Sequence, residues 1–293
     1  MKVEAECAGC IVSRAVAEAT EATTNPALRF RAVAEVLRLL NREFRPTAVP
    51  ADLGTKRDRL IKKITGNGDP YERLKGQSNR TALKLLPYAR EIVEDGYNQQ
   101  DRFKRASLCA IVGNVMEFGI PSHRFTFGSV RKLLREAARD LAIDDTNKIY
   151  ATAKSANRVL YLTDNAGEIV FDTVLVEQLK SMGIAVTVAV KSEPIINDAT
   201  YRDAETSGMT GVADRVITTG TDAVGLVLKE SSEEFAEAYN SAHMIFAKGM
   251  GYAETLTECR LTRPHVLLFR TKCDCVANYF GVPCGKNVAK MMP

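Results

Sequence analysis

Short apolar runs rich in β-branched residues alternate with helical stretches in the second half of the chain. The runs cover residues 158–163, 184–190, 212–218, 243–247 and 265–270. Each has the length of a buried strand rather than of a helix. Strands that alternate with helices pair in parallel, with helices on both faces of the sheet. The sequence therefore predicts an α/β fold built on a mainly parallel sheet.

The first half of the chain has a different texture, because β-branched runs are scarce there and apolar residues recur at helical spacing. The segment Asp69-Pro70-Tyr71-Glu72 carries the capping residues of a helix start. Similar helical patterns cover residues 101–118 and 128–142. This half is therefore predicted to be helical.

The change of pattern divides the chain into a helical region over residues 1–150 and an α/β domain over residues 151–293, with a linker near residues 144–155. The first part holds 26 Lys and Arg against 19 Asp and Glu, whereas the second holds 14 against 17. The basic excess is expected on solvated helix faces. No basic run is interleaved with aromatic residues, as a single-stranded nucleic-acid surface requires, so nucleic acid is not an expected partner.

The chain has 293 residues and is 45% hydrophobic, which is enough for a full core. No stretch of the sequence is long and apolar enough to span a membrane, and residues 1–13 lack the pattern of a signal peptide. The sequence therefore predicts a cytoplasmic protein without a membrane partner.

Polar side chains follow the first two predicted strands, at the sheet edge where open parallel sheets bind ligands. Asp164, Asn165 and Glu168 follow the first strand, and Asp198 follows the second. Carboxylate and amide oxygens bind hard cations such as Mg²⁺, and the helix amino terminus that comes next attracts anions. Ordinary helix capping and an Asn/Asp turn are the alternatives. Two such tips on neighbouring strands favour a shared metal ion.

A further polar tip follows the fourth predicted strand. Lys248 follows this strand directly, and Gly249 and Gly251 flank Met250. Glycines around a bulky residue allow the backbone to approach a ligand closely, and a lysine here can pair with a phosphate as a point charge. The sequence contains no P-loop and no complete dinucleotide-binding fingerprint. Lys248, Gly249 and Gly251 are therefore candidate substrate contacts.

Several short motifs occur in a characteristic order along the chain. They are DPYERLK at 69–75, the Gly113-Asn114 pair, TDNAGE at 163–168, IINDAT at 195–200, TTGTDAVG at 218–225, KGMG at 248–251 and KCDCVANYFGVPCGKNV at 272–288. In this order and spacing they resemble the metal-dependent damage-control phosphatase family, long known as domain of unknown function eighty-nine. The cysteines near both ends resemble those of its archaeal and bacterial branch.

This resemblance implies a Rossmann-like three-layer α/β/α domain preceded by a helical region. It implies a divalent ion (Mg²⁺, Mn²⁺, Co²⁺ or Ni²⁺) held by Asp164, Asn165 and Asp198, so that both aspartates take part in catalysis. It also implies hydrolysis of phosphate monoesters, with a small phosphorylated metabolite such as a sugar phosphate or a damaged phosphometabolite as substrate. Lys248 falls on the lysine expected to contact phosphate, and Asn114 is expected to contact the substrate.

The resemblance leaves the nucleophile open between a water molecule and an aspartate carboxylate. Glu168 is predicted as a catalytic base or as a neighbour of the metal ligands. Asp172, one helical turn later, is expected to be a solvated or structural residue. Two positions depart from the family: Glu117 replaces an Asp of many relatives, and Tyr252 replaces an Asn. Substrate specificity can differ at these positions.

The cysteines at Cys7, Cys10, Cys109, Cys259, Cys273, Cys275 and Cys284 are not explained by a phosphatase site. Cys7, Cys10, Cys273 and Cys275 predict a second metal or redox site, because thiolates from both chain ends can hold zinc or an iron–sulfur cluster if those ends meet. The C-x-C spacing is unusual for zinc. Free reduced cysteines are the alternative, with Cys109 and Cys259 expected in the core.

Two other function classes compete with a phosphatase. One is a regulatory metal- or redox-binding protein that is organised by the cysteines and has no phosphatase activity. It predicts metal loss when Cys7 or Cys273 is changed. The other is a methyltransferase, which needs an adenosine pocket, yet no glycine-rich fingerprint follows the first predicted strand.

Overall fold

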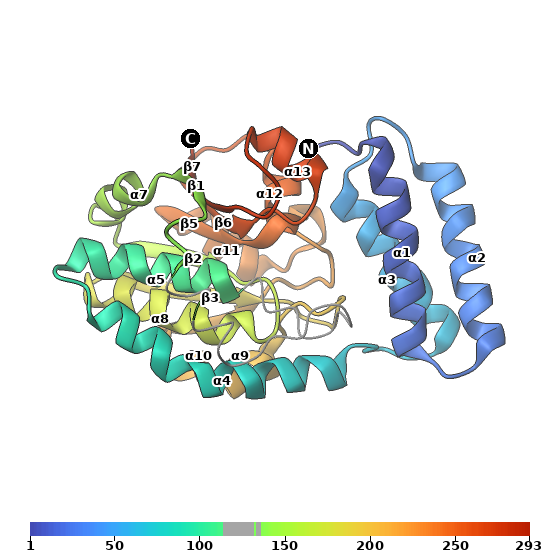
Figure 1. Ribbon diagram of the computed structural model, residues 1–293, viewed down its shortest axis with the longest axis horizontal. Coiled ribbons are helices and arrows are strands. Elements are labelled where there is room, and N and C mark those ends of the chain that lie inside the picture. Colours follow the sequence, from blue (N-terminus) through green and yellow to red (C-terminus); the bar gives the residue numbers. More distant parts are fainter. Residues whose placement is uncertain (114–131, 133–135) are drawn as a thin grey trace.

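A computed structural model describes residues 1–113, 132 and 136–293. Within these residues the chain forms a seven-stranded sheet in the order β1-β7-β6-β5-β2-β3-β4, with helices on both faces. Figure 1 shows a further group of helices, α1–α3, standing beside this layered part at one end of the molecule. Asn114 and Glu117 lie outside the described residues.

The strands are β1 (Leu141–Asp144), β2 (Arg158–Leu162), β3 (Ala185–Val190), β4 (Arg215–Thr218), β5 (Met244–Lys248), β6 (His265–Arg270) and β7 (Asn287–Met292). Strands β6, β5, β2, β3 and β4 run parallel to one another. In contrast, β7 pairs antiparallel with β6 and parallel with β1. Strands β2 to β6 fall on the runs that the sequence predicts as strands, so the mainly parallel α/β architecture is confirmed.

The sequence pattern does not predict β1 or β7. The prediction of a helix over residues 128–142 is wrong at its end, where β1 begins. Leu141 pairs with Asn287 across the sheet edge, so a contact between distant parts of the chain decides this strand. The half predicted as helical therefore contributes one strand to the sheet, and the division near residue 150 stays a prediction.

Alternate side chains of the central strand β2 enter different cores, as the two-residue period of a strand requires. Val159 and Tyr161 pack on one face, whereas Leu160 and Leu162 pack on the other. Helices of the first face are α4 (Glu72–Glu94), α5 (Gln99–Gly113), α7 (Thr146–Ala153), α8 (Glu168–Ser181), α9 (Tyr201–Ser207) and α10 (Met209–Val212). Helices of the second face are α11 (Glu233–Ser241), α12 (Gly249–Leu256) and α13 (Asp274–Phe280), and the short η1 (Leu228–Glu230) precedes α11.

The separate helices are α1 (Ala5–Ala22), α2 (Pro26–Glu43) and α3 (Pro50–Thr65). Asn25 caps α2 by accepting two backbone N–H groups, and Pro26 occupies its first turn. The group buries its own apolar core, which includes Ile11, Leu53 and Ile61. Among the described residues, no helix is long and apolar enough to cross a membrane.

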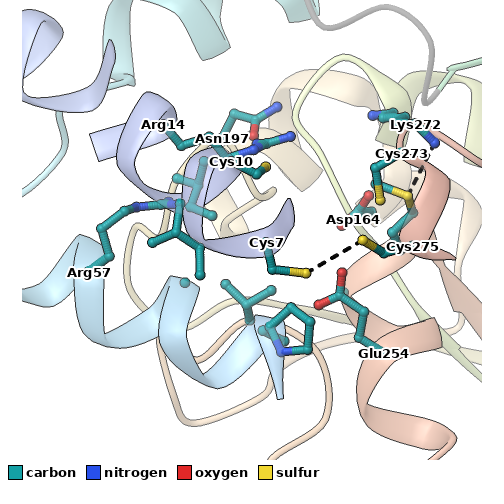
Figure 2. A pocket seen from close by; sticks show the side chains of 18 of the residues that line it. Cys7, Cys10, Arg14, Arg57, Asp164, Asn197, Glu254, Lys272, Cys273 and Cys275 are labelled. Atoms are coloured by element: carbon teal, nitrogen blue, oxygen red, sulfur yellow. Dashed lines mark hydrogen bonds between the residues drawn. The ribbon is translucent and has the colours of Figure 1, made fainter. Parts of the chain in front are cut away.

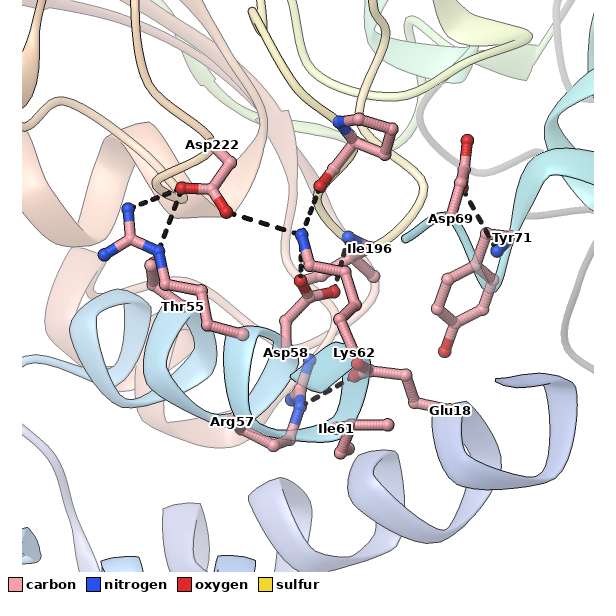
Figure 3. A network of polar contacts seen from close by, with 12 residues as sticks. Glu18, Thr55, Arg57, Asp58, Ile61, Lys62, Asp69, Tyr71, Ile196 and Asp222 are labelled. Carbon is pink, nitrogen blue, oxygen red and sulfur yellow. Dashed lines mark hydrogen bonds and ion pairs between the residues drawn. The ribbon is translucent and has the colours of Figure 1, made fainter. Parts of the chain in front are cut away.

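Charged side chains of α3 attach this helical group to loops at the sheet edge (Figure 3). Arg59 donates to Asp222 Oδ1 at 2.5 and 2.9 Å and pairs with Glu230 at 2.6 Å. Lys62 donates to the Pro194 carbonyl at 2.5 Å. Because Pro194 follows β3 and Asp222 follows β4, these contacts fix α3 against two loops at the carboxyl edge of the sheet.

Arg57 of α3 pairs with Glu18 of α1 at 3.1 Å, and both side chains are buried. Removing one partner of a buried pair leaves the other charge uncompensated, which typically costs about 3–5 kcal/mol. We expect Arg57→Ala to lower the free energy of unfolding by about this amount, measured by urea denaturation.

Lys56→Ala is the matched control, because Lys56 precedes Arg57 but pairs with Glu43 on the surface. Exposed ion pairs contribute about 0–1 kcal/mol, so this variant should unfold almost as the parent protein does. Equal losses in the two variants would contradict a special role for the buried pair.

Candidate functional site

The order of the sheet reverses between its central strands β2 and β5, which lie side by side. The chain runs outward from β2 through β3 and β4, returns to β5, and then runs outward through β6 on the other side. Loops diverge at such a point, and open α/β sheets bind ligands in the resulting crevice. Asp164 and Asn165 follow β2, and Gly249 follows β5, so these residues lie at the reversal.

The loop after β3 is hydrogen bonded to the loop after β2. The Ala199 N–H donates to the Asp164 carbonyl at 2.7 Å. Beside this bond, Asn165 and Asp198 form an isolated antiparallel bridge. The structure therefore brings together Asp164, Asn165 and Asp198, the residues that the sequence predicts as metal ligands.

These residues line a cavity of about 450 Å³ that is bordered by α1 and α3 (Figure 2). This volume suits a small-molecule ligand. The polar residues of its wall include Asp164, Asn165, Asn197, Asp198, Arg14, Arg57, Glu254, Lys272, Cys7, Cys10, Cys273, Cys275 and Cys284. Carboxylates, basic side chains and thiols thus face one cavity.

Burial and mutual repulsion disfavour the ionised carboxylates of this cavity. Burial raises the pKa of Asp164 well above its usual range, and the charges of Glu168 and Asp198 raise it further. Burial also raises the pKa of Asp198 to about 7, although the Lys191 ammonium, 3.8 Å away, acts in the opposite direction. A divalent cation between the carboxylates would reverse both effects, because it stabilises their charged forms.

Tyr252 adds an unsatisfied hydroxyl close to these carboxylates. Its ring lies 5.0 Å from Lys191 Nζ. The charges of Asp198 and Asp164 add to burial in raising the Tyr252 pKa. The buried hydroxyl has no hydrogen-bond partner within the described part of the chain. Such a group usually marks the place of an ion, a water molecule or a ligand, so the donor set fits a bound metal and its ligands.

Lys248 lies at the end of β5 with its ammonium fully buried. It donates to Asp172 Oδ1 at 2.7 Å and to the Ala110 carbonyl at 2.9 Å, and it pairs with Glu168. Tyr161 also donates to Asp172, at 2.8 Å. Asp172 is therefore a buried structural residue and not a solvated one. Because protein acceptors surround its ammonium, the predicted contact of Lys248 with phosphate stays a prediction.

Glu168 begins α8 and orients the side chain of Asn165. The Asn165 amide nitrogen donates to Glu168 Oε2 at 3.0 Å and to Asp164 Oδ2 at 2.8 Å. Glu168 thus links the predicted ligands to the buried ammonium of Lys248.

Gly249 allows Asp164 to occupy its position. A Cβ at Gly249 would lie 1.9 Å from Asp164 Oδ2, and its φ of +81° disfavours other residues. Gly251 lines the cavity, and a Cβ there would lie 2.7 Å from Val224 Cγ1. Gly249 therefore contacts a predicted metal ligand, whereas Gly251 permits close packing of the loop after β4. Their direct contact with substrate stays a prediction.

Asp58 of α3 holds the loop that carries Asp198. The Ile196 N–H donates to Asp58 Oδ1 at 2.9 Å (Figure 3). Ile196 has a φ of +46°, which is unusual for a β-branched residue and requires support from its surroundings. Sequence reasoning missed Asp58, because nothing in its local pattern indicates a partner 138 residues away.

Lys272 is a second functional candidate that sequence reasoning missed. It lines the cavity, and its positive charge lowers the pKa of Asp164 against the effect of burial. Figure 2 shows its side chain on the wall that also carries Cys273. The sequence clue to Lys272 was its position at the start of the KCDC segment. That clue points to a phosphate contact only if this segment lies near the ends of the strands, which the sequence does not show.

The two ends of the chain meet at the same cavity. Cys7 and Cys10 of α1 face it together with Cys273 and Cys275, and the sulfurs of Cys7 and Cys275 are 3.8 Å apart. Cys109 is buried in the core as predicted. The core prediction for Cys259 is wrong, because this residue is exposed just after α12.

The chain is similar to known proteins over its whole length. The family model of the damage-control phosphatase ARMT1-like domain matches residues 3–288. A damage-control phosphatase of Archaeoglobus fulgidus is 36% identical over 100% of both chains. Damage-control phosphatase PH1575 of Pyrococcus horikoshii is 37% identical over 98% of this chain and 97% of its own. A crystal structure of PH1575, described as a DUF89 family protein, superimposes with a TM-score of 0.87 at 35% identity, covering 99% of this chain and 98% of that one.

The contact between Gly249 and Asp164 is testable by stability and ion binding. Gly249→Ala forces a methyl group against the Asp164 carboxylate, and overpacking of this kind costs about 1–3 kcal/mol beyond the backbone strain. We expect the variant to lose that much unfolding free energy in urea and to lose binding of Mn²⁺ in equilibrium dialysis.

Gly183→Ala isolates the contact from the backbone strain. Gly183 also has a φ of +81°, but a Cβ there would meet nothing within 4 Å. This variant should show the strain alone and bind Mn²⁺ normally. Equal behaviour of the two variants would remove the assigned role of Gly249.

Proposed function

The chain belongs to the family of damage-control phosphatases with an ARMT1-like domain, and from this membership we propose that it is a divalent-metal-dependent phosphatase of small metabolites. The observation that carries the proposal is the bridge between Asn165 and Asp198, because it gathers oxygen-bearing side chains at the strand-order reversal. Sheets of the Rossmann-like type bind their ligands where the strand order reverses, which is where we propose this site.

Asp164, Asn165 and Asp198 would hold the ion, which can be Mg²⁺, Mn²⁺, Co²⁺ or Ni²⁺. Their oxygen donors suit such cations. Burial is the main cause of the raised pKa of both aspartates, and a bound cation would favour their ionised forms. When bound, the ion supplies neutralisation of a phosphoryl oxygen and orientation of the nucleophile. Glu168 would position Asn165 rather than act as a base, because it is buried and paired with Lys248.

The phosphoryl group would lie between these ligands and Lys272, with the rest of the substrate in the cavity. Lys272 and Arg14 supply basic side chains on the cavity wall, and the volume of about 450 Å³ accommodates a sugar phosphate or a damaged phosphometabolite. Hydrolysis breaks the bond between phosphorus and the ester oxygen and forms one to the oxygen of water, releasing an alcohol and inorganic phosphate. The buried Tyr252 hydroxyl, which has no partner among the described residues, would donate to an oxygen in the site.

A cysteine-organised metal-binding protein without phosphatase activity remains the second candidate function. The convergence of Cys7 and Cys275 beside the carboxylates favours it. The two candidates are separated by turnover, since this alternative predicts no hydrolysis of any phosphate monoester with any divalent ion.

The proposal predicts metal-dependent turnover on a panel of sugar phosphates. Asp164→Asn and Asp198→Asn remove a ligand charge without changing side-chain size. We expect each to lower the turnover number by about 100-fold or more, because even outer partners of metal ligands are worth 10- to 100-fold. Phosphate release is measured with Mg²⁺, Mn²⁺, Co²⁺ and Ni²⁺ in turn.

Asp95→Asn is the control, since Asp95 is an exposed residue at the end of α4. It should keep full turnover with every ion. Metal-dependent turnover that survives both substitutions at the site would refute the ligand assignment.

Substitutions at Lys272 and Lys248 distinguish a lysine that binds phosphate from one that supports the fold. Lys272→Met should weaken competitive inhibition by inorganic phosphate by about 10-fold or more, because a hydrogen bond to a charged group contributes about 1.5–3 kcal/mol. Lys248→Met should instead destabilise the fold by about 3–5 kcal/mol, because it leaves Glu168 and Asp172 buried without their cation.

Lys286→Met provides a charge-matched control, because Lys286 pairs with Asp140 away from the cavity lining. Its inhibition constant for phosphate should equal that of the parent protein. A large loss of phosphate affinity in a folded Lys248→Met variant, with none in Lys272→Met, would refute Lys272 as the phosphate contact and favour Lys248.

A further inference from the structure

Thiols from both ends of the chain share a wall of the cavity with the carboxylate site. We propose that Cys7 and Cys275, completed by Cys10 and Cys273, bind one zinc-type metal ion that is distinct from the ion at Asp164. This second site does not depend on the proposed phosphatase activity, because its residues and their geometry are independent of the carboxylate ligands.

The separation of the first two sulfurs fits a common metal ion. Cys7 Sγ and Cys275 Sγ are 3.8 Å apart, and both residues are buried. In a tetrahedral zinc site with bonds of about 2.3 Å to sulfur, neighbouring sulfurs are about 3.8 Å apart. Figure 2 shows the two side chains pointing toward each other from α1 and α13. The pair therefore already has the spacing of two ligands.

The other two thiols stand on the same elements as this pair. Cys10 lies one helical turn after Cys7, so both project from one side of α1. Cys273 precedes α13, and Cys275 is in its first turn. Cys10 and Cys273 line the same cavity as Cys7 and Cys275.

The charges around the thiols favour a cation over a redox or nucleophilic role. Oxygens of Glu4 and Glu6 lie within 4.8 Å of the Cys275 sulfur and of each other. Cys275 is buried, and buried structural cysteines are poorly reactive. A bound metal ion offsets this concentration of acidic groups and deprotonates the thiols that ligate it.

Such an ion would tie together segments that are 268 residues apart. It would fix α1, and with it the helices α1–α3, against the segment that begins α13. Lys272 directly precedes Cys273, so the same ion would hold the cationic side chain beside Asp164. Because binding occurs in the folded chain and not in the unfolded one, zinc should raise the melting temperature of the protein.

Cobalt titration of the full, reduced and chelator-treated chain tests the proposal. Co²⁺ bound by thiolates gives a charge-transfer absorption band in the near ultraviolet, whereas Co²⁺ bound by oxygens does not. We expect one thiolate-bound Co²⁺ per chain, displaced by Zn²⁺. Cys7→Ser and Cys275→Ser should lower zinc affinity by about 100-fold or more. Cys10→Ser and Cys273→Ser should lower it by at least about 10-fold.

Matched controls separate the two metal sites and exclude misfolding. Cys259→Ser should keep the band, because Cys259 is exposed and does not face the cavity. The double variant Asp164→Asn, Asp198→Asn should also keep it, so a failed phosphatase assignment leaves this test intact. Circular dichroism verifies the fold of each variant, and the exposed position of Cys10 makes Cys10→Ser the variant most tolerant of substitution.

Three results would overturn the proposal. The first is the absence of a thiolate band in the reduced parent protein. The second is a band that persists unchanged in folded Cys7→Ser and Cys275→Ser. The third is zinc affinity that falls in Glu4→Gln and Glu6→Gln but not in Cys10→Ser or Cys273→Ser, because carboxylates and not thiolates would then complete the site.

Discussion

The backbone bonds between the loops after β2 and β3 are the contacts on which the candidate site depends. The Ala199 N–H donates to the Asp164 carbonyl, and the Ala166 N–H donates to the Asn197 carbonyl. These bonds satisfy polar groups just beyond the strand ends, where the sheet ladder no longer does so. They also place the two loops in one register. Without that register, acidic residues from neighbouring strands would not converge at the reversal of strand order.

The helices α1 and α3 contribute residues to the wall of the candidate site. Asp58 of α3 supports the strained backbone at Ile196, close to Asp198. Lys62, one turn later, holds the Pro194 carbonyl in the same loop. In Figure 3 these contacts join the helix to the loop at adjacent points. Because bundle and loop are connected by charged and backbone groups, a displacement of α3 would be transmitted to the candidate metal ligands.

Oxygen and sulfur donors line the same cavity, but the two kinds of donor prefer different metal ions. Carboxylate and amide oxygens suit Mg²⁺ and Mn²⁺, whereas thiolates select zinc and other softer ions. Lys272 connects the two groups, because it faces the Asp164 side of the cavity and directly precedes Cys273. If both proposed sites are filled, one ion would hold Lys272 in place and the other would assist hydrolysis.

The sequence by itself determined the strands β2 to β6 and the polar residues at their ends, because strand length and flanking residues are local properties. Tertiary structure alone decided the edge strands, the burial of Lys248 and the meeting of Cys7 with Cys275. Each of these depends on contacts between segments far apart in the chain, such as the 268 residues between the two cysteines. A local pattern identifies what a residue can do, but only the packed fold determines which partner it meets.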